Sequence, residues 1–134
     1  MKLEHVGIAV KDLGVSNELF KKLLGKQQYK IEIVESEGVA TSFFSTGESK
    51  VELLEANNED STISKYISKK GEGVHHLAFN VDDIAMEMIR LKNAGFELIN
   101  DQPKAGADGK LICFLNPKTT NGVLIELCQD IKNG

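Results

Sequence analysis

Four residues of types that bind metal ions and transfer protons occur at matched positions in the two halves of this sequence. His5 and His76 each open an alternating apolar segment, and Glu52 and Glu126 each interrupt a later apolar run. Neutral imidazoles and carboxylates together suit a divalent transition metal, and two carboxylates balance its double charge. A carboxylate in an apolar core without a partner is costly. The pattern therefore predicts a metal site made from one histidine and one glutamate of each half.

An internal repeat relates these residues. The segment Glu4–Leu13 matches the segment His75–Ile84 at an offset of 71 residues, in a histidine, in the apolar positions and in an aspartate. Apolar residues at helical spacing follow each segment and end at a glycine, Gly25 in the first half and Gly95 in the second. A repeat of this kind indicates two copies of one structural module.

Short alternating runs after each helix predict strands. The expected strands are Tyr29–Glu35, Val39–Ser45 and Lys50–Glu55 in the first half, and Phe96–Asn100, Lys110–Leu115 and Gly122–Cys128 in the second. A short helix is expected at Ser61–Lys69 between the halves. Each half then has the element order β-α-β-β-β, which predicts an α+β fold of paired βαβββ modules forming a curved mixed sheet around a central cavity. We expect one domain over residues 1–134, with module one over about 1–57, a linker helix over about 59–70 and module two over about 73–130.

Strand alternation gives each histidine a face lined by small residues. His5 shares its face with Gly7 and Ala9, and His76 shares its face with Ala78. Small residues leave room above a sheet, so these faces are where a cavity is expected. A single histidine or glutamate in a strand is usually structural. The recurrence of the same two types at corresponding places in both halves is what favours a metal site.

Other reactive residues are interpreted as structural. His75 faces away from His76 by alternation, which suits a structural or rim position. Cys128 shares the parity of Glu126, where it either approaches the metal or fills the core, and Cys113 is expected in the core. The stretch Gly106–Lys110 has the wrong spacing for a phosphate-binding loop and leads into a strand, so we expect a flexible rim loop.

Composition narrows the possible partners and location. The chain has 134 residues and a formal net charge of −4, with 41% hydrophobic and 27% charged residues, as in an ordinary globular domain. The absence of a dense Lys/Arg tract argues against nucleic acid, and no run approaches the ~18 apolar residues of a membrane span. No signal-peptide pattern opens the sequence, and two cysteines are too few for a disulfide framework. A cytoplasmic protein with two free, buried thiols is therefore expected.

Longer motifs resemble a known family. They are His5–Leu13, Gly71–Phe79, Phe114–Lys118 and Gly122–Leu127. With these motifs the sequence resembles the vicinal oxygen chelate (glyoxalase/bleomycin resistance) superfamily and, within it, the methylmalonyl-CoA epimerases over nearly its whole length. The resemblance implies metal ligands at His5, Glu52, His76 and Glu126, in agreement with the residues found by alternation.

The resemblance also implies a reaction. It is the interconversion of the two C2 epimers of methylmalonyl-CoA by 1,1-proton transfer through a metal-stabilised enolate, with an acid/base on each face. Glu126 is the expected catalytic residue on one face. Some family members carry a second catalytic glutamate at the position of Thr41, which cannot act as a base. We therefore expect Glu52 to serve as the opposite acid/base while also binding the metal.

The implied partners are an acyl-CoA substrate, one divalent metal ion per chain and a second copy of the chain in a homodimer, with a role in propionate metabolism. Co²⁺ is the expected metal, and Mn²⁺, Ni²⁺ and Zn²⁺ also suit nitrogen and oxygen ligands. The phosphates of an acyl-CoA require a local basic rim on this acidic protein. Lys104, Lys110 and Lys118 either supply that rim or are ordinary surface lysines.

Three other functions use the same fold. A glyoxalase I-type lactoyl-thiol lyase, acting on hemithioacetals, shares the metal and the carboxylate pair and is the main alternative. A metal-free binding module would not need the four candidate ligands. A ring-cleaving dioxygenase would use two histidines and one carboxylate and leave positions open for oxygen.

Overall fold

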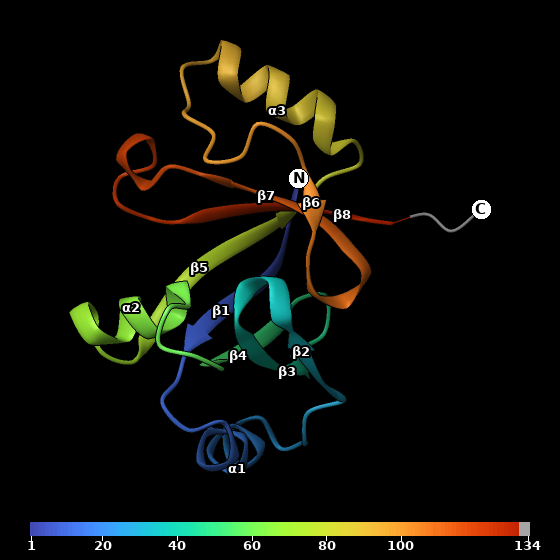
Figure 1. The fold of residues 1–134 in the computed structure, drawn as a ribbon. Helices are drawn as coiled ribbons and strands as arrows, with labels where there is room; N and C mark the ends of the chain where they lie inside the picture. The colour runs from blue at the N-terminus through green and yellow to red at the C-terminus, as the bar shows by residue number, and fades with distance from the viewer. Residues whose placement is uncertain (132–134) are drawn as a thin grey trace. The chain divides into compact units, whose positions relative to one another are not determined.

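The computed structural model describes residues 1–131 (Figure 1). These residues divide into two compact units. The first unit is His5–His75, and the second unit comprises Met1–Glu4 and the described residues from His76 onward. The boundaries lie inside strands β1 (Lys2–Ala9) and β5 (Gly73–Asn80), so that each unit begins its main segment at a candidate metal-binding histidine.

The first unit contains the His5–Ala9 part of β1 and the next three strands of the chain. These are β2 (Lys30–Val34), β3 (Val39–Ser45) and β4 (Lys50–Ala56), with helices α1 (Leu13–Leu24) and α2 (Thr62–Lys70) and a 3-10 turn η1 (Glu35–Glu37). Its strand order is β2-β3-β4-β1. Strands β1 and β4 run parallel, and the other pairs are antiparallel.

The second unit repeats this arrangement. Its elements are β5, α3 (Ile84–Asn93), β6 (Lys104–Ala105), η2 (Ala107–Gly109), β7 (Lys110–Leu115), η3 (Pro117–Thr119) and β8 (Ile125–Asp130). The strand order is β6-β7-β8-β5, with β5 and β8 parallel. The predicted α+β class with paired βαβββ modules is therefore confirmed.

Equivalent aspartates start the first helix of each module. The Asp12 side chain accepts a hydrogen bond from the Val15 backbone N–H, and Asp83 accepts one from Met86. Both aspartates have extended backbone angles, as N-cap residues do. The repeat noticed in the sequence thus fixes the same strand-to-helix turn twice.

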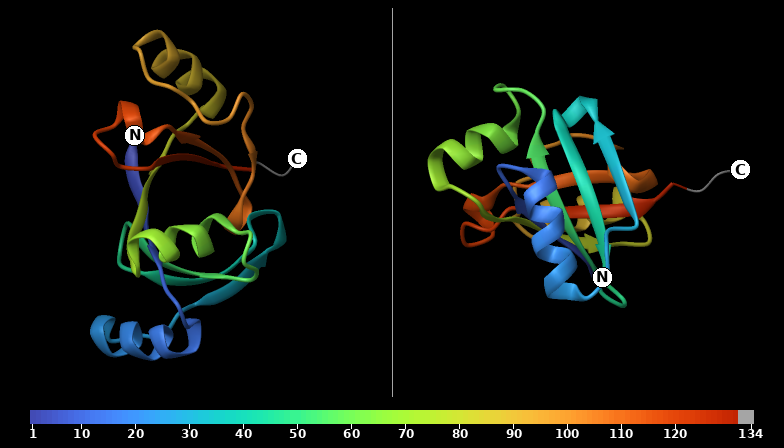
Figure 2. Two further views of the ribbon diagram at one scale, coloured as in Figure 1. Left: turned by 60° about the vertical axis from the view of Figure 1, so that its left-hand side comes forward. Right: turned by 90° about the horizontal axis from the view of Figure 1, so that it is seen from below.

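The sheet of the first unit lies between two helices (Figure 2). On one face Leu53 and Phe44 are fully buried in a cluster with Phe20 and Leu24 of α1. On the other face, Ala9, Val39 and Leu54 pack with Ile63, Tyr66 and Ile67 of α2. Because neighbours along a strand point to opposite faces, His5 and Glu52 lie on the same face as α2. Neither residue belongs to the apolar cluster under α2.

The second unit has its main core on the α3 side. Met88 and Leu91 of α3 pack with Cys113 and Leu127 of the sheet. On the opposite face a smaller cluster joins Ala78, Ile112 and Cys128. His76 and Glu126 share this second face by alternation. In both units, then, the candidate ligands lie on the face opposite the first helix of the module.

One predicted strand does not form. Residues Phe96–Asn100 contain only an isolated bridge between Leu98 and Leu115, and the module's second strand is the short β6 instead. The Asn100 side chain accepts a hydrogen bond from the Phe114 backbone N–H at 2.8 Å, replacing a backbone partner. Pro103, which has no N–H to offer, follows before β6. Alternation alone does not reveal that a side chain will end the pairing.

The last strand also begins later than predicted, at Ile125 rather than Gly122. Gly122 has a φ of 83° and lies in a turn, where its backbone N–H donates to the Pro117 carbonyl. None of the helices within residues 1–131 is long and apolar enough to cross a membrane.

Candidate active site

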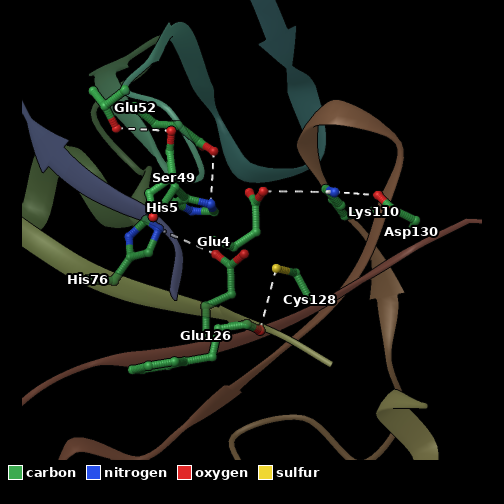
Figure 3. Close-up of polar contacts among 11 residues, drawn as sticks. Glu4, His5, Ser49, Glu52, His76, Lys110, Glu126, Cys128 and Asp130 are labelled. Atoms are coloured by element: carbon green, nitrogen blue, oxygen red, sulfur yellow. Dashed lines mark hydrogen bonds and ion pairs between the residues drawn. The ribbon is translucent and has the colours of Figure 1, made fainter. Parts of the chain in front are cut away.

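The first unit brings His5 and Glu52 together (Figure 3). His5 Nδ1 lies 2.9 Å from Glu52 Oε2, and each residue is 4% exposed. The strand register causes this contact: Gly7 lies directly opposite Glu52 in the parallel pair β1–β4, so His5 is a diagonal neighbour on the same face. A buried carboxylate in this strand therefore has an imidazole partner, as its burial requires.

The second unit brings His76 and Glu126 together in the same way (Figure 3). His76 Nε2 lies 3.3 Å from Glu126 Oε1, and the residues are 5% and 6% exposed. Ala78 lies directly opposite Glu126 in the parallel pair β5–β8. The Phe114 ring meets the His76 ring edge-on, with centroids 6.2 Å apart, which restricts the orientation of the imidazole.

The two pairs are equivalent by position in the repeat. In each unit the histidine stands two residues before a glycine or alanine, and that small residue lies directly opposite the glutamate. Each unit thus brings together the histidine and the glutamate that the sequence pattern assigns to its half.

The donor chemistry of each pair fits a divalent transition metal. Each of the four side chains offers a nitrogen or a carboxylate oxygen as a ligand atom, and all four are buried. Imidazole nitrogen and carboxylate oxygen are ligands that Zn²⁺, Co²⁺, Ni²⁺ and Mn²⁺ share. Each pair supplies two ligands, whereas such ions take at least four.

His75 has a structural environment. Its ring packs edge-on against Tyr66 of α2, with centroids 4.9 Å apart, and the Tyr66 hydroxyl donates to the Val74 carbonyl at 2.7 Å. Burial lowers the pKa of His75 to about 4, so its imidazole is neutral at pH 7. The structural interpretation of this residue agrees with these contacts.

Neither cysteine forms a disulfide, and both are fully buried. Cys128 is on the Glu126 face, where its Sγ donates to the Phe79 carbonyl at 3.5 Å and packs with Ile112. Cys113 lies in the α3-side core. Burial, with a smaller contribution from the negative charge of Glu126, raises the pKa of the Cys113 thiol to about 11. Both residues therefore behave as small core side chains.

Lys110 is not a rim lysine. It is only 9% exposed and forms an ion pair with Asp130, which lies directly opposite it in the β7–β8 register. Its Nζ is also 4.0 Å from Glu4 Oε2. Lys104 and Lys118 are exposed. The strand predicted at Lys110–Leu115 forms with the same bounds, but the sequence does not show that the Lys110 side chain is buried against Asp130.

Two further residues share the face of the His5–Glu52 pair. Thr41 is fully buried, and its hydroxyl has no hydrogen-bond partner among the described residues. Lys30 of the edge strand β2 lies with its ammonium 5.1 Å from the centre of the Phe43 ring. The sequence pattern passed over Lys30, although the alternation Lys30-Ile31-Glu32-Ile33 does place both charged residues on one face.

Comparison with known proteins places these features in a family. Residues 4–114 match the sequence model of the Glyoxalase/Bleomycin resistance protein/Dioxygenase superfamily. An uncharacterised protein, YqjC, of Bacillus subtilis is 38% identical over 96% of this chain and 91% of its own length. An ethylmalonyl-CoA/methylmalonyl-CoA epimerase of Cereibacter sphaeroides is 37% identical, over 96% of this chain and 97% of its own length.

A solved structure is similar over the same extent. A variant of methylmalonyl-CoA epimerase from Streptomyces coelicolor, in complex with 2-nitronate-propionyl-CoA, has a TM-score of 0.92 and 33% identity. It covers 98% of this chain, which in turn covers 99% of that structure. These comparisons confirm the resemblance to the methylmalonyl-CoA epimerases that the motifs indicate, and the relatives named as epimerases are enzymes. The chain belongs to the glyoxalase/bleomycin resistance protein/dioxygenase superfamily.

Proposed function

We propose that this protein is a metal-dependent epimerase that interconverts the two C2 epimers of methylmalonyl-CoA. The observation that carries the proposal is the buried His–Glu pair that recurs at the same register position in both units. The substrate comes from the relatives, which are named as epimerases of this acyl-CoA and match nearly the whole chain.

We propose His5, Glu52, His76 and Glu126 as the ligands of one divalent ion. The argument is one of donor number, because each unit supplies two buried ligands and an ion of this class takes at least four. Two imidazoles and two carboxylates also give a neutral complex with a doubly charged ion. When bound, such an ion acts as a Lewis acid that stabilises negative charge on the thioester oxygen of an acyl-CoA.

The carboxylates then perform the proton transfer. Glu126 takes the proton from C2 on one face, and the electron pair of the broken C–H bond moves into the enolate of the thioester. Glu52, released from the ion and protonated by solvent beforehand, returns a proton to C2 on the opposite face, which inverts the configuration. Exchange with solvent restores both side chains. Thr41 cannot replace either carboxylate, because a hydroxyl is too weak a base at neutral pH.

An epimerase assay tests the proposal. The protein is freed of metal with a chelator, reloaded separately with Co²⁺, Mn²⁺, Ni²⁺ or Zn²⁺, and assayed on one epimer of methylmalonyl-CoA. The expected result is formation of the other C2 epimer only when metal has been added. The same preparations are assayed with the hemithioacetal of methylglyoxal. Turnover of the hemithioacetal alone would replace the proposal by the glyoxalase I-type reaction.

The proposal also carries the expectations that follow from the resemblance. They are a cytoplasmic location, a homodimer, a role in propionate metabolism and Co²⁺ as the preferred ion. A reducing compartment suits the two thiols, since neither Cys113 nor Cys128 forms a disulfide. These expectations stay predictions of the proposed function.

A further inference from the structure

The chain passes between its two compact units twice, each time directly before a candidate metal-binding histidine. The first crossing follows Glu4 and the second follows His75, so His5 and His76 are the first residues after the crossings. Glu4 and His75 are also equivalent in the internal repeat, which has an offset of 71 residues. The residue before each histidine therefore belongs to the unit that the chain is leaving.

In the second unit, Lys110 holds Glu4 at the first crossing (Figure 3). Lys110 Nζ lies 4.0 Å from Glu4 Oε2, and both side chains are 11% exposed. The same ammonium forms an ion pair with Asp130, which lies directly opposite Lys110 in the β7–β8 register. Breaking up buried charges leaves one of them without a partner, which is strongly unfavourable. The contact therefore ties the residue before His5 to strand β7.

In the first unit, Tyr66 of α2 holds His75 at the second crossing. The two rings meet edge-on with centroids 4.9 Å apart, and the Tyr66 hydroxyl donates to the Val74 carbonyl at 2.7 Å. One side chain thus contacts both residues that precede the crossing. Tyr66 itself packs in the apolar cluster of Ile63 and Leu54, which fixes its position on the sheet.

We infer that Lys110 and Tyr66 are positioning residues of the proposed metal site, which act through the residue before each candidate histidine. The inference rests on the proposed function, in which one ion takes ligands from both units. Each unit builds its own His–Glu pair, but a pair supplies only two ligands. The geometry of the complete set then depends on the two crossings. Residues outside the ligand set that orient ligands typically change metal affinity about 10–100-fold.

Stabilisation of the fold is the alternative role for these contacts, and the ion pair argues against it. Replacing a buried ion pair by apolar residues is often neutral or stabilising, so stability alone does not call for Lys110 and Glu4. The two anchors also differ in chemistry, one being ionic and the other aromatic. They share only their place, which is the residue directly before a candidate ligand.

Two substitutions test the anchors by Co²⁺ binding to the full chain. Lys110→Met and Tyr66→Leu each keep the four proposed ligands and an apolar side chain of similar length or volume, but remove the anchoring contact. Titration with Co²⁺ followed by visible absorption gives both the Kd and the spectrum of the bound ion. Each variant should raise the Kd of Co²⁺ about tenfold or more and change the intensity of its absorption bands, because the ligands no longer keep one geometry.

Three further variants separate position from stability. Tyr66→Phe keeps the ring contact with His75 and should retain most of the Co²⁺ affinity. Ile63→Val loosens the packing of α2 without removing the Tyr66 ring, and Lys92→Met removes an exposed charge from α3 of the second unit. Both of these controls should leave the Kd unchanged. Urea denaturation of the metal-free proteins shows that each variant is folded under the binding conditions.

An unchanged Kd and spectrum in either folded anchor variant overturns the inference for that anchor. A loss of affinity in Ile63→Val as large as in Tyr66→Leu also overturns it, because affinity would then follow stability. Absence of Co²⁺ binding to the wild-type chain refutes the proposed metal site instead. Hydrogen exchange of the metal-free protein then tests the anchors. The peptide that contains His5 should exchange faster in Lys110→Met and the peptide that contains His76 faster in Tyr66→Leu, and unchanged exchange overturns the inference.

Discussion

Glu52 lies directly opposite Gly7 in the parallel strands β1 and β4, and so the strand beside this buried carboxylate carries no side chain at that level. The repeat places Ala78 opposite Glu126 in the same manner. Glycine and alanine are poor strand formers, so their use at both positions weakens the sheet locally. What both positions have in common is space next to a carboxylate, which a bound ion and a substrate acyl group need.

Removal of either histidine should empty the metal site. His5→Ala and His76→Ala each leave three of the four proposed ligands. Loss of a residue that only hydrogen-bonds to a ligand already weakens metal binding about tenfold or more, so loss of a ligand should weaken Co²⁺ binding at least as much. Equilibrium dialysis followed by elemental analysis measures the bound metal. Full metal content in either variant would show that the two units do not share one ion.

Glu126→Gln should stop proton exchange at C2 more than it weakens substrate binding. A positioned acid/base contributes about 10²–10⁴-fold to the rate, and the amide cannot accept the proton. The measurement is deuterium incorporation from solvent into methylmalonyl-CoA, followed by mass spectrometry. Glu18→Gln, on the exposed side of α1, is the matched control. Deuterium uptake near the wild-type rate in Glu126→Gln would show that another group is the base.

Strand alternation predicts the His–Glu contact within each unit, while the metal-binding and catalytic roles of these residues stay predictions. His5 and Glu52 share a face if the apolar residues of β1 and β4 pack under the same helix, and the repeat carries the same conclusion to the second half. Side-chain interactions with the backbone are harder to foresee. The Asn100 side chain accepts the hydrogen bond from the Phe114 backbone N–H, and the strand predicted at Phe96–Asn100 does not form.

The contacts of charged side chains are also hard to predict from the sequence. The pattern predicts Lys110 as the first residue of a strand beside a rim loop, but not as a buried partner of Asp130. The pairing depends on a register between two strands that the sequence pattern does not specify. For the same reason Lys30 becomes recognisable only when β2 is aligned with β3, which brings its ammonium over Phe43.

The two thiols should resist modification in the folded protein. Cys113 and Cys128 are both fully buried, and the raised pKa of Cys113 keeps its thiol protonated at pH 8. An aromatic disulfide reagent should therefore release less than ~0.1 equivalent of thiolate from the native chain within minutes. In 6 M guanidinium, as a roughly standard fully denaturing condition, both thiols should react. Rapid reaction of one full equivalent with the native protein would mean that one of the two cores opens readily.

Glu55 should stabilise the first module through the start of α1. The Leu13 backbone N–H donates to Glu55 Oε2 at 2.6 Å, and in the second module the Ile84 N–H donates to Gln129 Oε1 at 2.7 Å. Without an acceptor, the partly buried N–H loses its partner, so Glu55→Ala should lower the free energy of unfolding by about 1–2 kcal/mol. Glu55→Gln keeps an acceptor of the kind that Gln129 provides and should cost only about 0.5 kcal/mol, from the lost charge near the helix N-terminus.

Urea denaturation of the metal-free protein measures both variants of Glu55, with Glu48→Ala in the exposed turn before β4 as the control. Metal is left out so that ligand binding does not add to the measured stability. If Glu55→Ala is as stable as Glu48→Ala, the hydrogen bond to Leu13 contributes nothing to folding. A loss in Glu55→Gln as large as in Glu55→Ala would show that the charge of Glu55, and not its hydrogen-bond acceptor, stabilises the first module.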